Sequence, residues 1–510
     1  MLSIIKSYGL SGINGYKVNA EVDINQGLPG YNIVGLVGTT MKESKERVKS
    51  AIKNSGFRYP FLKITINLAP ADTKKEGPVY DLPITIGILA ASEQLDNRLC
   101  EEFLFLGELG LDGSVRKIKG VLPMLITARQ EGIKKIVLPA SNQHEASFIE
   151  GLEIYTVNSL KECVQFLKKE IELDRVAFNS FDKIISEQQP KLDFKFIKGQ
   201  FQAKRALEIS AAGGHNILMI GPPGSGKTML AKAYSSILPK LTFLESLEVT
   251  KIHSIAGILD DEVGIVTERP FRAPHHTSTL PALTGGGRLA KPGEISLAHT
   301  GVLFLDEMPE YPRNSLETLR QPLEDGVISV ARVENTVIYP ANFSLIASMN
   351  PCPCGNYGSA ENVCRCTPQQ IRKYLNKLSG PLMDRIDIHI EVDSVKYNDL
   401  TDNSLSESSE VIKTRVDRAR NIQHNRFIGT KSHSNASMTD KQLKEFCEIS
   451  LESNAVLKTA FQKFKLSARA YNRILKLART IADLDESKNI ETEHIIEAIS
   501  YRSLDKKYWE

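Results

Sequence analysis

A glycine-rich octapeptide near the middle of the chain constrains the fold more than any other segment. It begins at Gly221 and reads Gly-Pro-Pro-Gly-Ser-Gly-Lys-Thr. The apolar run 217–220 precedes it and Met-Leu-Ala-Lys-Ala follows it, which predicts a buried strand, a loop and a helix in that order. Backbone N–H groups of such a loop surround phosphate oxygens. The segment therefore predicts a phosphate-binding P-loop, because a turn that binds nothing has no need of this full spacing.

The P-loop also predicts how a nucleoside triphosphate would be held. Lys227 is expected to neutralise the β and γ phosphates, and Thr228 to offer its hydroxyl to Mg²⁺. All eight residues of the loop are predicted to bind the nucleotide: Gly221, Pro222, Pro223, Gly224, Ser225, Gly226, Lys227 and Thr228.

Length and charge limit the remaining possibilities. The chain has 510 residues, too many for one hydrophobic core, so about three domains are expected. A formal net charge of +3 means that any nucleic-acid surface must be a local basic patch. We find neither an apolar stretch of membrane-spanning length nor the apolar core of a signal peptide, and we expect a cytoplasmic protein with no membrane partner.

Hydrophobic patterning divides the chain into three parts, two of mixed α/β structure followed by one that is helical. Residues 1–170 alternate short β-branched runs (63–67 and 135–138) with helix-like segments (41–54 and 120–131), and a polar linker follows at 171–195. Residues 196–395 contain apolar runs typical of a buried parallel sheet. Residues 396–510 begin with a polar connector and continue with helical spacing. The predicted helices of this last part are 410–423, 439–448, 451–464, 468–482 and 492–500.

Two further buried strands end in residues suited to a nucleotide site. The run 301–305 is followed by Asp306, predicted to hold Mg²⁺ through water, and by Glu307, predicted to polarise the attacking water. The run 344–349 ends at Asn350, whose amide is predicted to sense the γ phosphate. Taken alone, the acids would be a solvated strand end and Asn350 a turn residue. Their order after the P-loop favours a complete hydrolysis site.

Two arginines extend this site. Arg385 precedes the predicted strand 386–392 and is expected to reach a neighbouring subunit's nucleotide as an arginine finger. Arg469 begins a helix of the last domain and is expected to report the γ phosphate to it. Most arginines are surface ion-pair partners of little energetic weight. The ordered set of motifs favours the catalytic interpretation.

With these residues the sequence resembles the YifB/ComM family of magnesium-chelatase-like AAA+ ATPases over essentially its whole length. Family-specific blocks carry the resemblance: 269–277 (Arg-Pro-Phe-Arg-Ala-Pro-His-His-Thr), 285–288 (Gly-Gly-Gly-Arg), 291–294 (Lys-Pro-Gly-Glu) and 298–301 (Ala-His-Thr-Gly). The resemblance implies a central AAA+ domain with magnesium-chelatase and MCM-like inserts, a C-terminal helical lid domain, and ATP and Mg²⁺ as ligands. Arg332 matches the hairpin position that carries a pore lysine in the related MCM helicases, so it is either a DNA contact or an exposed hairpin charge. For His275 and His276 a structural loop role is favoured over metal binding.

The resemblance also implies a Lon-protease-like N-terminal domain. Val79 takes the place of the nucleophilic serine of active Lon proteases, and Met124 the place of the catalytic lysine. A Ser-Lys dyad needs both groups, so peptidase activity is not expected. A shifted register would bring in Lys117 or Lys119, but no serine.

Four of the seven cysteines crowd into fifteen residues, as two C-x-C pairs: Cys352, Cys354, Cys364 and Cys366. Four thiolates would close a tetrahedral structural Zn²⁺ site. The spacing departs from the usual C-x-x-C, and reduced cysteines in a loop remain the alternative.

The sequence thus predicts a ring, most simply a homohexamer, because each subunit's site needs an arginine from its neighbour. The resemblance implies a DNA motor, a helicase or branch-migration enzyme of homologous recombination or natural transformation. The competing hypothesis is a chelatase-type motor that remodels a partner protein.

Overall fold

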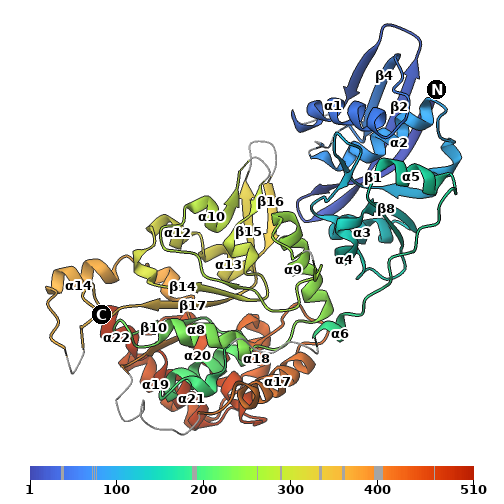
Figure 1. The fold of residues 1–510 in the computed structure, drawn as a ribbon. Coiled ribbons are helices and arrows are strands. Elements are labelled where there is room, and N and C mark those ends of the chain that lie inside the picture. Colours follow the sequence, from blue (N-terminus) through green and yellow to red (C-terminus); the bar gives the residue numbers. More distant parts are fainter. Residues whose placement is uncertain are drawn as a thin grey trace. The chain divides into compact units, whose positions relative to one another are not determined.

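The computed structural model describes all of the chain except residues 36–38, 72, 74, 76, 186–191, 261, 288–289, 332–335, 359–361, 395–405, 465 and 510. The chain is a mixed α/β protein with a helical C-terminal region (Figure 1). It forms two compact units. The first comprises residues 1–187 and 242–267, and the second comprises residues 188–241 and 268–510.

The first unit is built on a seven-stranded sheet in the order β3-β4-β2-β1-β5-β8-β9. Strands β1 and β2 form a long antiparallel pair, β2 pairs antiparallel with β4, and the pairs on either side of this core are parallel. The strands are β1 (Leu2–Ser11), β2 (Asn14–Asn25), β3 (Gly30–Val34), β4 (Lys63–Ala69), β5 (Phe103–Phe105), β8 (Lys135–Pro139) and β9 (Glu153–Val157); β6 (Glu108–Leu109) and β7 (Val115–Arg116) make a separate ribbon.

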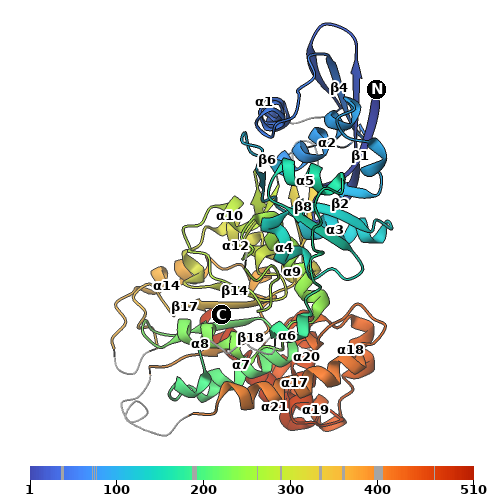
Figure 2. The same ribbon diagram turned by 45° about the vertical axis from the view of Figure 1, so that its right-hand side comes forward.

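Helix α2 (Asp81–Ala91) is the central helix of this unit. All eleven of its residues are buried, and it packs on β1 and β2 with α1 (Thr39–Asn54) beside it (Figure 2). The other helices are α3 (Val121–Gln130), α4 (Gln143–Ala146), α5 (Leu160–Leu167), α6 (Phe181–Ile185) and α9 (Phe243–Ala256). The predicted helices 41–54 and 120–131 and strands 63–67 and 135–138 are confirmed.

Helix α9 belongs to the first unit although it follows the P-loop in sequence. Thr242 and Glu245 form a capping box at its start. Near its end, the Ser254 hydroxyl donates to Glu145 Oε1 (2.5 Å) and accepts a hydrogen bond from the Gly120 N–H (2.9 Å). The helix is therefore fixed by polar contacts to the residues around α3 and α4.

The second unit contains a parallel five-stranded sheet in the order β11-β14-β17-β10-β18. Its strands are β10 (Ile217–Ile220), β11 (Phe271–Arg272), β14 (Val302–Leu305), β17 (Ser344–Met349) and β18 (Ile388–Glu391). Four of them confirm the apolar runs recognised in the sequence, at 217–220, 301–305, 344–349 and 386–392. Two short antiparallel ribbons accompany the sheet, β12 (Gly285–Gly286) with β13 (Lys291–Pro292), and β15 (Val327–Ala331) with β16 (Thr336–Pro340).

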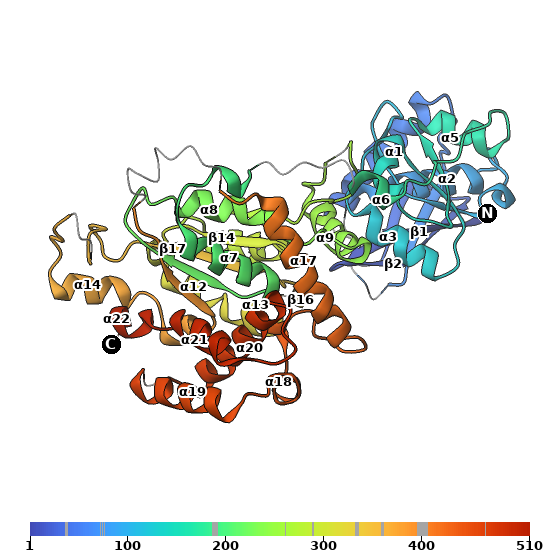
Figure 3. The ribbon, with the colours of Figure 1, turned by 90° about the horizontal axis from the view of Figure 1, so that it is seen from below.

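Helices cover the sheet of the second unit on both faces. One face packs through alternate strand residues, such as Ile217 and Met219, against α7 (Phe201–Gly213), α8 (Lys227–Tyr234) and the C-terminal helices. Helix α17 runs beside α7 (Figure 3). The C-terminal helices are α17 (Ser409–Arg426), α18 (Asp440–Phe446), α19 (Leu451–Lys463), α20 (Ala468–Leu484), α21 (Thr492–Ser500) and α22 (Leu504–Trp509), and they confirm the five predicted helical segments.

Shorter helices lie among the family-specific blocks and after β17. They are α10 (Leu280–Thr284), α11 (Glu294–Leu297), α12 (Arg313–Glu317), α13 (Arg320–Asp325), α14 (Pro368–Leu375) and α15 (Gly380–Met383). Helix α13 leads directly into β15, so it supports the base of the β15–β16 ribbon.

Candidate nucleotide site

The P-loop has the strand, loop and helix geometry that the sequence predicts. It connects the end of β10 to the start of α8, where Gly226 adopts a left-handed conformation (φ 88°) that favours glycine. A Cβ atom on Gly221 would lie 2.1 Å from the Val392 carbonyl oxygen, so only glycine fits there. The loop is thus shaped by close backbone packing at one end and by a left-handed turn at the other.

Lys227 points its ammonium group into the loop itself. Its Nζ donates to the carbonyl oxygens of Gly221 and Pro222, each at 2.8 Å, and lies 3.3 Å from Ser225 Oγ. Burial lowers the pKa of Lys227, while Asp306 and Glu307 act in the opposite direction. The charge is therefore held among neutral oxygens, which anionic phosphate oxygens would outcompete.

The P-loop and the acidic strand meet at a pair of oxygens. Thr228 Oγ1 donates to Asp306 Oδ2 at 2.9 Å, and the Ser348 hydroxyl donates to Asp306 Oδ1. The parallel register of β10, β17 and β14 brings these carboxyl ends to one edge of the sheet. Carboxylate and hydroxyl oxygens so arranged suit Mg²⁺, which prefers oxygen ligands. Ser348 was missed from the sequence, although its place two residues before Asn350 on the same strand is a recognisable signal.

Glu307 follows Asp306 in an unusual backbone conformation. Its φ of 52° is left-handed, and its N–H donates to Asp306 Oδ1 at 3.1 Å. Its carboxylate lies 3.5 Å from His276 Nδ1. A bulky residue rarely adopts this conformation without a functional or structural reason. The histidine predicted to be structural is therefore placed against the predicted catalytic carboxylate, a contact that spacing along the chain does not reveal.

Asn350 lies immediately beyond the ladder that joins β17 to β10. The Gly221 N–H donates to the Met349 carbonyl at 3.1 Å, which fixes the end of β17 against the first residue of the P-loop. The backbone of Asn350 is in turn hydrogen-bonded to Tyr374 of α14. The chain therefore places Asn350 beside the P-loop through backbone contacts on both sides.

A small hollow adjoins the other side of the P-loop. Its volume is about 120 Å³, and its lining includes Ile197, Gln200, Ser225, Met229 and Leu230. Gln200 Nε2 donates to the carbonyls of Ser225 (3.3 Å) and Asp393 (2.6 Å). An apolar recess with a few amide groups beside a phosphate site suits a nucleotide base.

The predicted arginine finger, Arg385, and the predicted γ-phosphate sensor, Arg469, meet on one carboxylate. Arg385 Nη2 donates to Glu324 Oε2, and Arg469 Nη2 lies 3.9 Å from Glu324 Oε1. The Arg385 side chain is 8% exposed and that of Arg469 is 60% exposed. The sequence signalled both arginines but not Glu324, because an isolated glutamate before a hairpin has no distinctive spacing.

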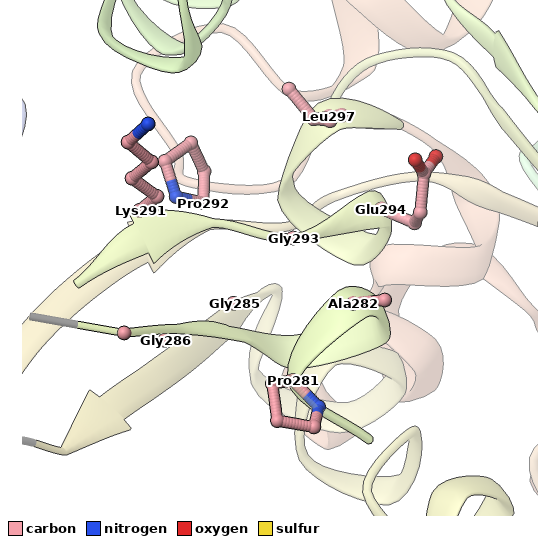
Figure 4. A pocket seen from close by; sticks show the side chains of 10 residues that line it. Pro281, Ala282, Gly285, Gly286, Lys291, Pro292, Gly293, Glu294 and Leu297 are labelled. Carbon is pink, nitrogen blue, oxygen red and sulfur yellow. The ribbon is translucent and has the colours of Figure 1, made fainter. Parts of the chain in front are cut away.

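Arg332 lies outside the described residues. In the sequence it falls between β15 and β16, and the ribbon of these two strands is attached to the β12–β13 ribbon, because the Tyr339 hydroxyl donates to the Ala290 carbonyl at 2.7 Å. A hollow of about 410 Å³ lies beside β12 and β13, between their glycines, Lys291 and Glu294 (Figure 4). None of the predicted catalytic residues lines it.

The four clustered cysteines come together. Cys352 Sγ lies 3.4 Å from Cys354 Sγ and 3.7 Å from Cys364 Sγ, and the last two are 3.6 Å apart. The sulfur of Cys366 completes a group in which all four atoms lie within 4.8 Å of one another. These distances exceed a disulfide bond of about 2.05 Å. The backbone N–H groups of Asn356 and Arg365 lower the pKa of Cys354 to about 6.

Val79 and Met124 of the first unit both have buried apolar side chains. Val79 precedes α2, and Met124 lies on α3 with 1% of its surface exposed. Their shared hydrophobic core has no room for a charged base without a large cost.

Comparisons with known proteins follow the same division of the chain. Three family models match: subunit ChlI of magnesium chelatase over residues 20–142, magnesium chelatase subunit ChlI over residues 193–400, and the C-terminal part of that subunit over residues 406–502. The chain is 42% identical to the competence protein ComM of Haemophilus influenzae and 44% identical to YifB of Escherichia coli. Each alignment covers 99% of this chain and 98% of the relative.

The chain belongs to the YifB/ComM family of magnesium-chelatase-like AAA+ ATPases. Membership of this AAA+ family implies ATPase activity with ATP and Mg²⁺ as ligands. A shorter alignment, 32% identical over 124 residues, relates 24% of the chain to 22% of Lon protease 2 of Bacillus subtilis. Among the described residues, the helices are all too short or too polar to span a bilayer.

Proposed function

We propose that this YifB/ComM family member is a ring-forming ATPase that couples ATP hydrolysis to DNA remodelling, as a helicase or branch-migration motor. The observation that carries the ATPase half is the 2.9 Å contact between Thr228 and Asp306, which joins the P-loop to the acidic strand. The DNA half is supported by the 42% identity to a protein named for competence, a process in which DNA is taken up. Natural transformation and homologous recombination are the proposed settings, in the cytoplasm.

The nucleotide site divides its work among three sets of residues. The P-loop, residues 221–228, binds the phosphates, with Lys227 as counter-charge. Thr228 and Asp306 hold Mg²⁺, which supplies charge neutralisation at the phosphates. Glu307 orients and polarises the attacking water, and Asn350 senses the γ phosphate through its amide. The left-handed backbone of Glu307 and its contact with His276 support this role by limiting where the carboxylate can point.

Two arginines make the site dependent on assembly. Arg385 acts as a finger on the nucleotide of the adjacent subunit, and Arg469 reports nucleotide state to the helical lid. Each site is then complete only in a closed ring, most simply a hexamer. The β15–β16 ribbon of each subunit grips the DNA phosphate backbone through Arg332 without reading sequence.

The cysteine cluster is proposed to hold a structural Zn²⁺ ion. Four sulfurs at about 2.3 Å from a tetrahedral zinc lie about 3.8 Å from one another. The separations of 3.4, 3.6 and 3.7 Å in the structure approach this value. Zinc would fix the loop after Asn350, with all four positions taken by protein and none left for chemistry.

The competing function is a chelatase-type motor that remodels a protein partner, favoured by the magnesium-chelatase family models. The N-terminal unit is proposed to bind partners or subunits and not to cleave peptides, because Val79 and Met124 supply neither nucleophile nor base.

Unwinding of branched DNA by the purified chain separates these functions. With ATP, wild-type protein is expected to separate a four-way junction and to hydrolyse ATP faster when DNA is present. Lys227→Ala should lose both activities, and Arg332→Ala should lose DNA stimulation while keeping basal hydrolysis. Basal hydrolysis without any unwinding or DNA stimulation would favour protein remodelling instead.

A further inference from the structure

Glu324 is the ion-pair partner of two arginines that lie in different parts of the second unit. Its carboxylate receives Arg385 on Oε2 and faces Arg469 across 3.9 Å on Oε1. These are the two arginines assigned to the nucleotide. Glu324 is the next-to-last residue of α13, and β15 begins three residues later at Val327.

The Arg385 side of this cluster is nearly closed to solvent. Arg385 Nη1 donates to the Pro381 carbonyl at 2.7 Å, and its Nε has no hydrogen-bond partner within the described part of the chain. Glu324 therefore supplies the counter-charge of a guanidinium that is 8% exposed. Glu324 itself is 53% exposed, so only the arginine end of the pair is buried, and loss of the Glu324 charge leaves that guanidinium without this counter-charge.

The Arg469 side is open. Arg469 and Glu324 are 60% and 53% exposed, and ion pairs of this kind contribute little to stability. Moving Glu324 away from the solvent-exposed Arg469 should therefore cost little free energy. The carboxylate can contact both arginines only while α13 keeps its position.

The backbone ties α13 to the base of the β15–β16 ribbon. Gly326 ends the helix in a left-handed conformation (φ 66°), with its N–H donating to the Pro322 carbonyl at 3.0 Å. Its own carbonyl accepts the Ala341 N–H at 2.8 Å, just beyond the end of β16. A displacement of the ribbon is therefore transmitted to Glu324 through two residues of backbone.

We propose that Glu324 is a positioning residue that holds Arg385 and Arg469 inside the free subunit and releases them when the β15–β16 ribbon is displaced by DNA. The release rests on the proposed function, whereas the holding of the arginines does not. Arg385 uses Nη1 on the Pro381 carbonyl and Nη2 on Glu324, so engagement of a neighbour's nucleotide by these groups requires that they leave their partners within the subunit. DNA-stimulated hydrolysis then follows from the exchange of one anion for another.

Glu324→Gln tests whether Glu324 holds the two arginines, because it keeps the shape of the side chain and removes its charge. Without DNA, its ATP hydrolysis is expected to rise about fivefold, the lower end of coupling between sites. Its stimulation by a single-stranded oligonucleotide should shrink by the same factor. Glu317→Gln, which removes a carboxylate at the end of α12 that lies 3.1 Å from Arg320 at the start of α13, should behave as wild type.

The outcomes are distinguishable from failure of the proposed function. If wild-type hydrolysis does not respond to DNA but Glu324→Gln is still faster than wild type, the holding role of Glu324 is supported and the proposed DNA motor is contradicted. If wild type is DNA-stimulated and Glu324→Gln has wild-type basal and stimulated rates, the proposed role of Glu324 is wrong. A thermal melt identifies a folding defect. In that case Glu324→Asp, which shortens the carboxylate by one methylene, should show a smaller rise, and a wild-type rate in that variant would overturn the proposal.

Discussion

The two units use the same kind of local architecture in opposite ways. In each, a loop leads into a helix that packs against a sheet, at α2 in the first unit and at α8 in the second. The second unit lines this junction with Lys227, Thr228 and Asp306, whose hydrogen bonds go to groups that a nucleotide and its metal can replace. The first unit has Val79 at its junction, where its side chain is part of the hydrophobic core.

The polar groups near α2 of the first unit satisfy one another. Asp81 is completely buried and accepts hydrogen bonds from Ser44 (2.5 Å) and from Arg47 Nε (2.7 Å). Such a closed set fixes α1 on α2 and leaves no group poised for a ligand. The difference shows that a polar cluster indicates a ligand site when its partners are exchangeable, and indicates structural support when they are complete.

Metal removal should produce the largest difference in stability between the two units. We expect about one zinc per chain, and chelation should destabilise the second unit by several kcal/mol, since structural zinc contributes roughly 10–16 kcal/mol of binding free energy in small domains. The loop is packed on the P-loop, because a Cβ on Gly355 would lie 2.6 Å from Pro223 Cδ. ATP binding should therefore weaken together with metal loss, while amide exchange of α2 stays slow.

A pair of cysteine variants controls this experiment. Cys354→Ser should lose the metal and the stability, whereas Cys447→Ala, in the same unit but outside the cluster, should keep a full metal content. Equal metal content in both variants would argue for reduced cysteines without an ion.

Truncation of Met124 should affect the first unit and spare the second. Met124→Ala is expected to lower the free energy of unfolding of the first unit by about 2–5 kcal/mol, because it leaves a cavity in a closed core. Met124→Leu, which conserves volume, should cost less than about 1.5 kcal/mol. Amide exchange of α3 reports the change, and the ATPase rate below the unfolding temperature should stay at the wild-type value. A loss of ATPase activity equal to that of a P-loop variant would show that the first unit carries part of the hydrolysis site.

The elements and motif residues were predictable because their signals are local. Strands such as 217–220 are short apolar runs, the predicted helix 468–482 carries helical spacing, and the P-loop is a contiguous octapeptide. Parallel pairing then brings Asp306 and Thr228 together, because strands of one sheet end at one edge.

Contacts between distant segments were not predictable. The His276–Glu307 and Arg385–Glu324 pairs join residues 31 and 61 positions apart, and neither follows from a period of 2 or 3.6. The packing of α9 in the first unit depends on Ser254 meeting Glu145, 109 residues away. Such pairings are decided by tertiary packing, which a single sequence does not display.

Each unit has one buried carboxylate whose contribution to folding stability should change on acidification, and the two changes should have opposite signs. In the second unit, burial raises the pKa of Asp387, but Arg473 and His215 outweigh it and hold the pKa well below its ordinary value. The unfolded chain binds a proton first, near pKa 3.9, so the stability from Asp387 is present above about pH 4 and is lost as pH falls toward the folded pKa. In the first unit, burial raises the pKa of Asp81, and hydrogen bonds from Arg47 and Ser44 offset only part of this. There the folded state binds the proton first, so the contribution of Asp81 improves as pH falls through its folded pKa.

Unfolding free energies of each unit, followed by amide exchange between about pH 7 and about pH 3.5, measure these slopes around the unperturbed aspartate pKa. Asp387→Asn should flatten the acid loss in the second unit, and Asp81→Asn should remove the acid gain in the first. A wild-type slope in Asp387→Asn would mean that its charge pair contributes nothing to folding. Slopes of the same sign from both aspartates would break the contrast between a carboxylate held by excess positive charge and one held mainly by burial.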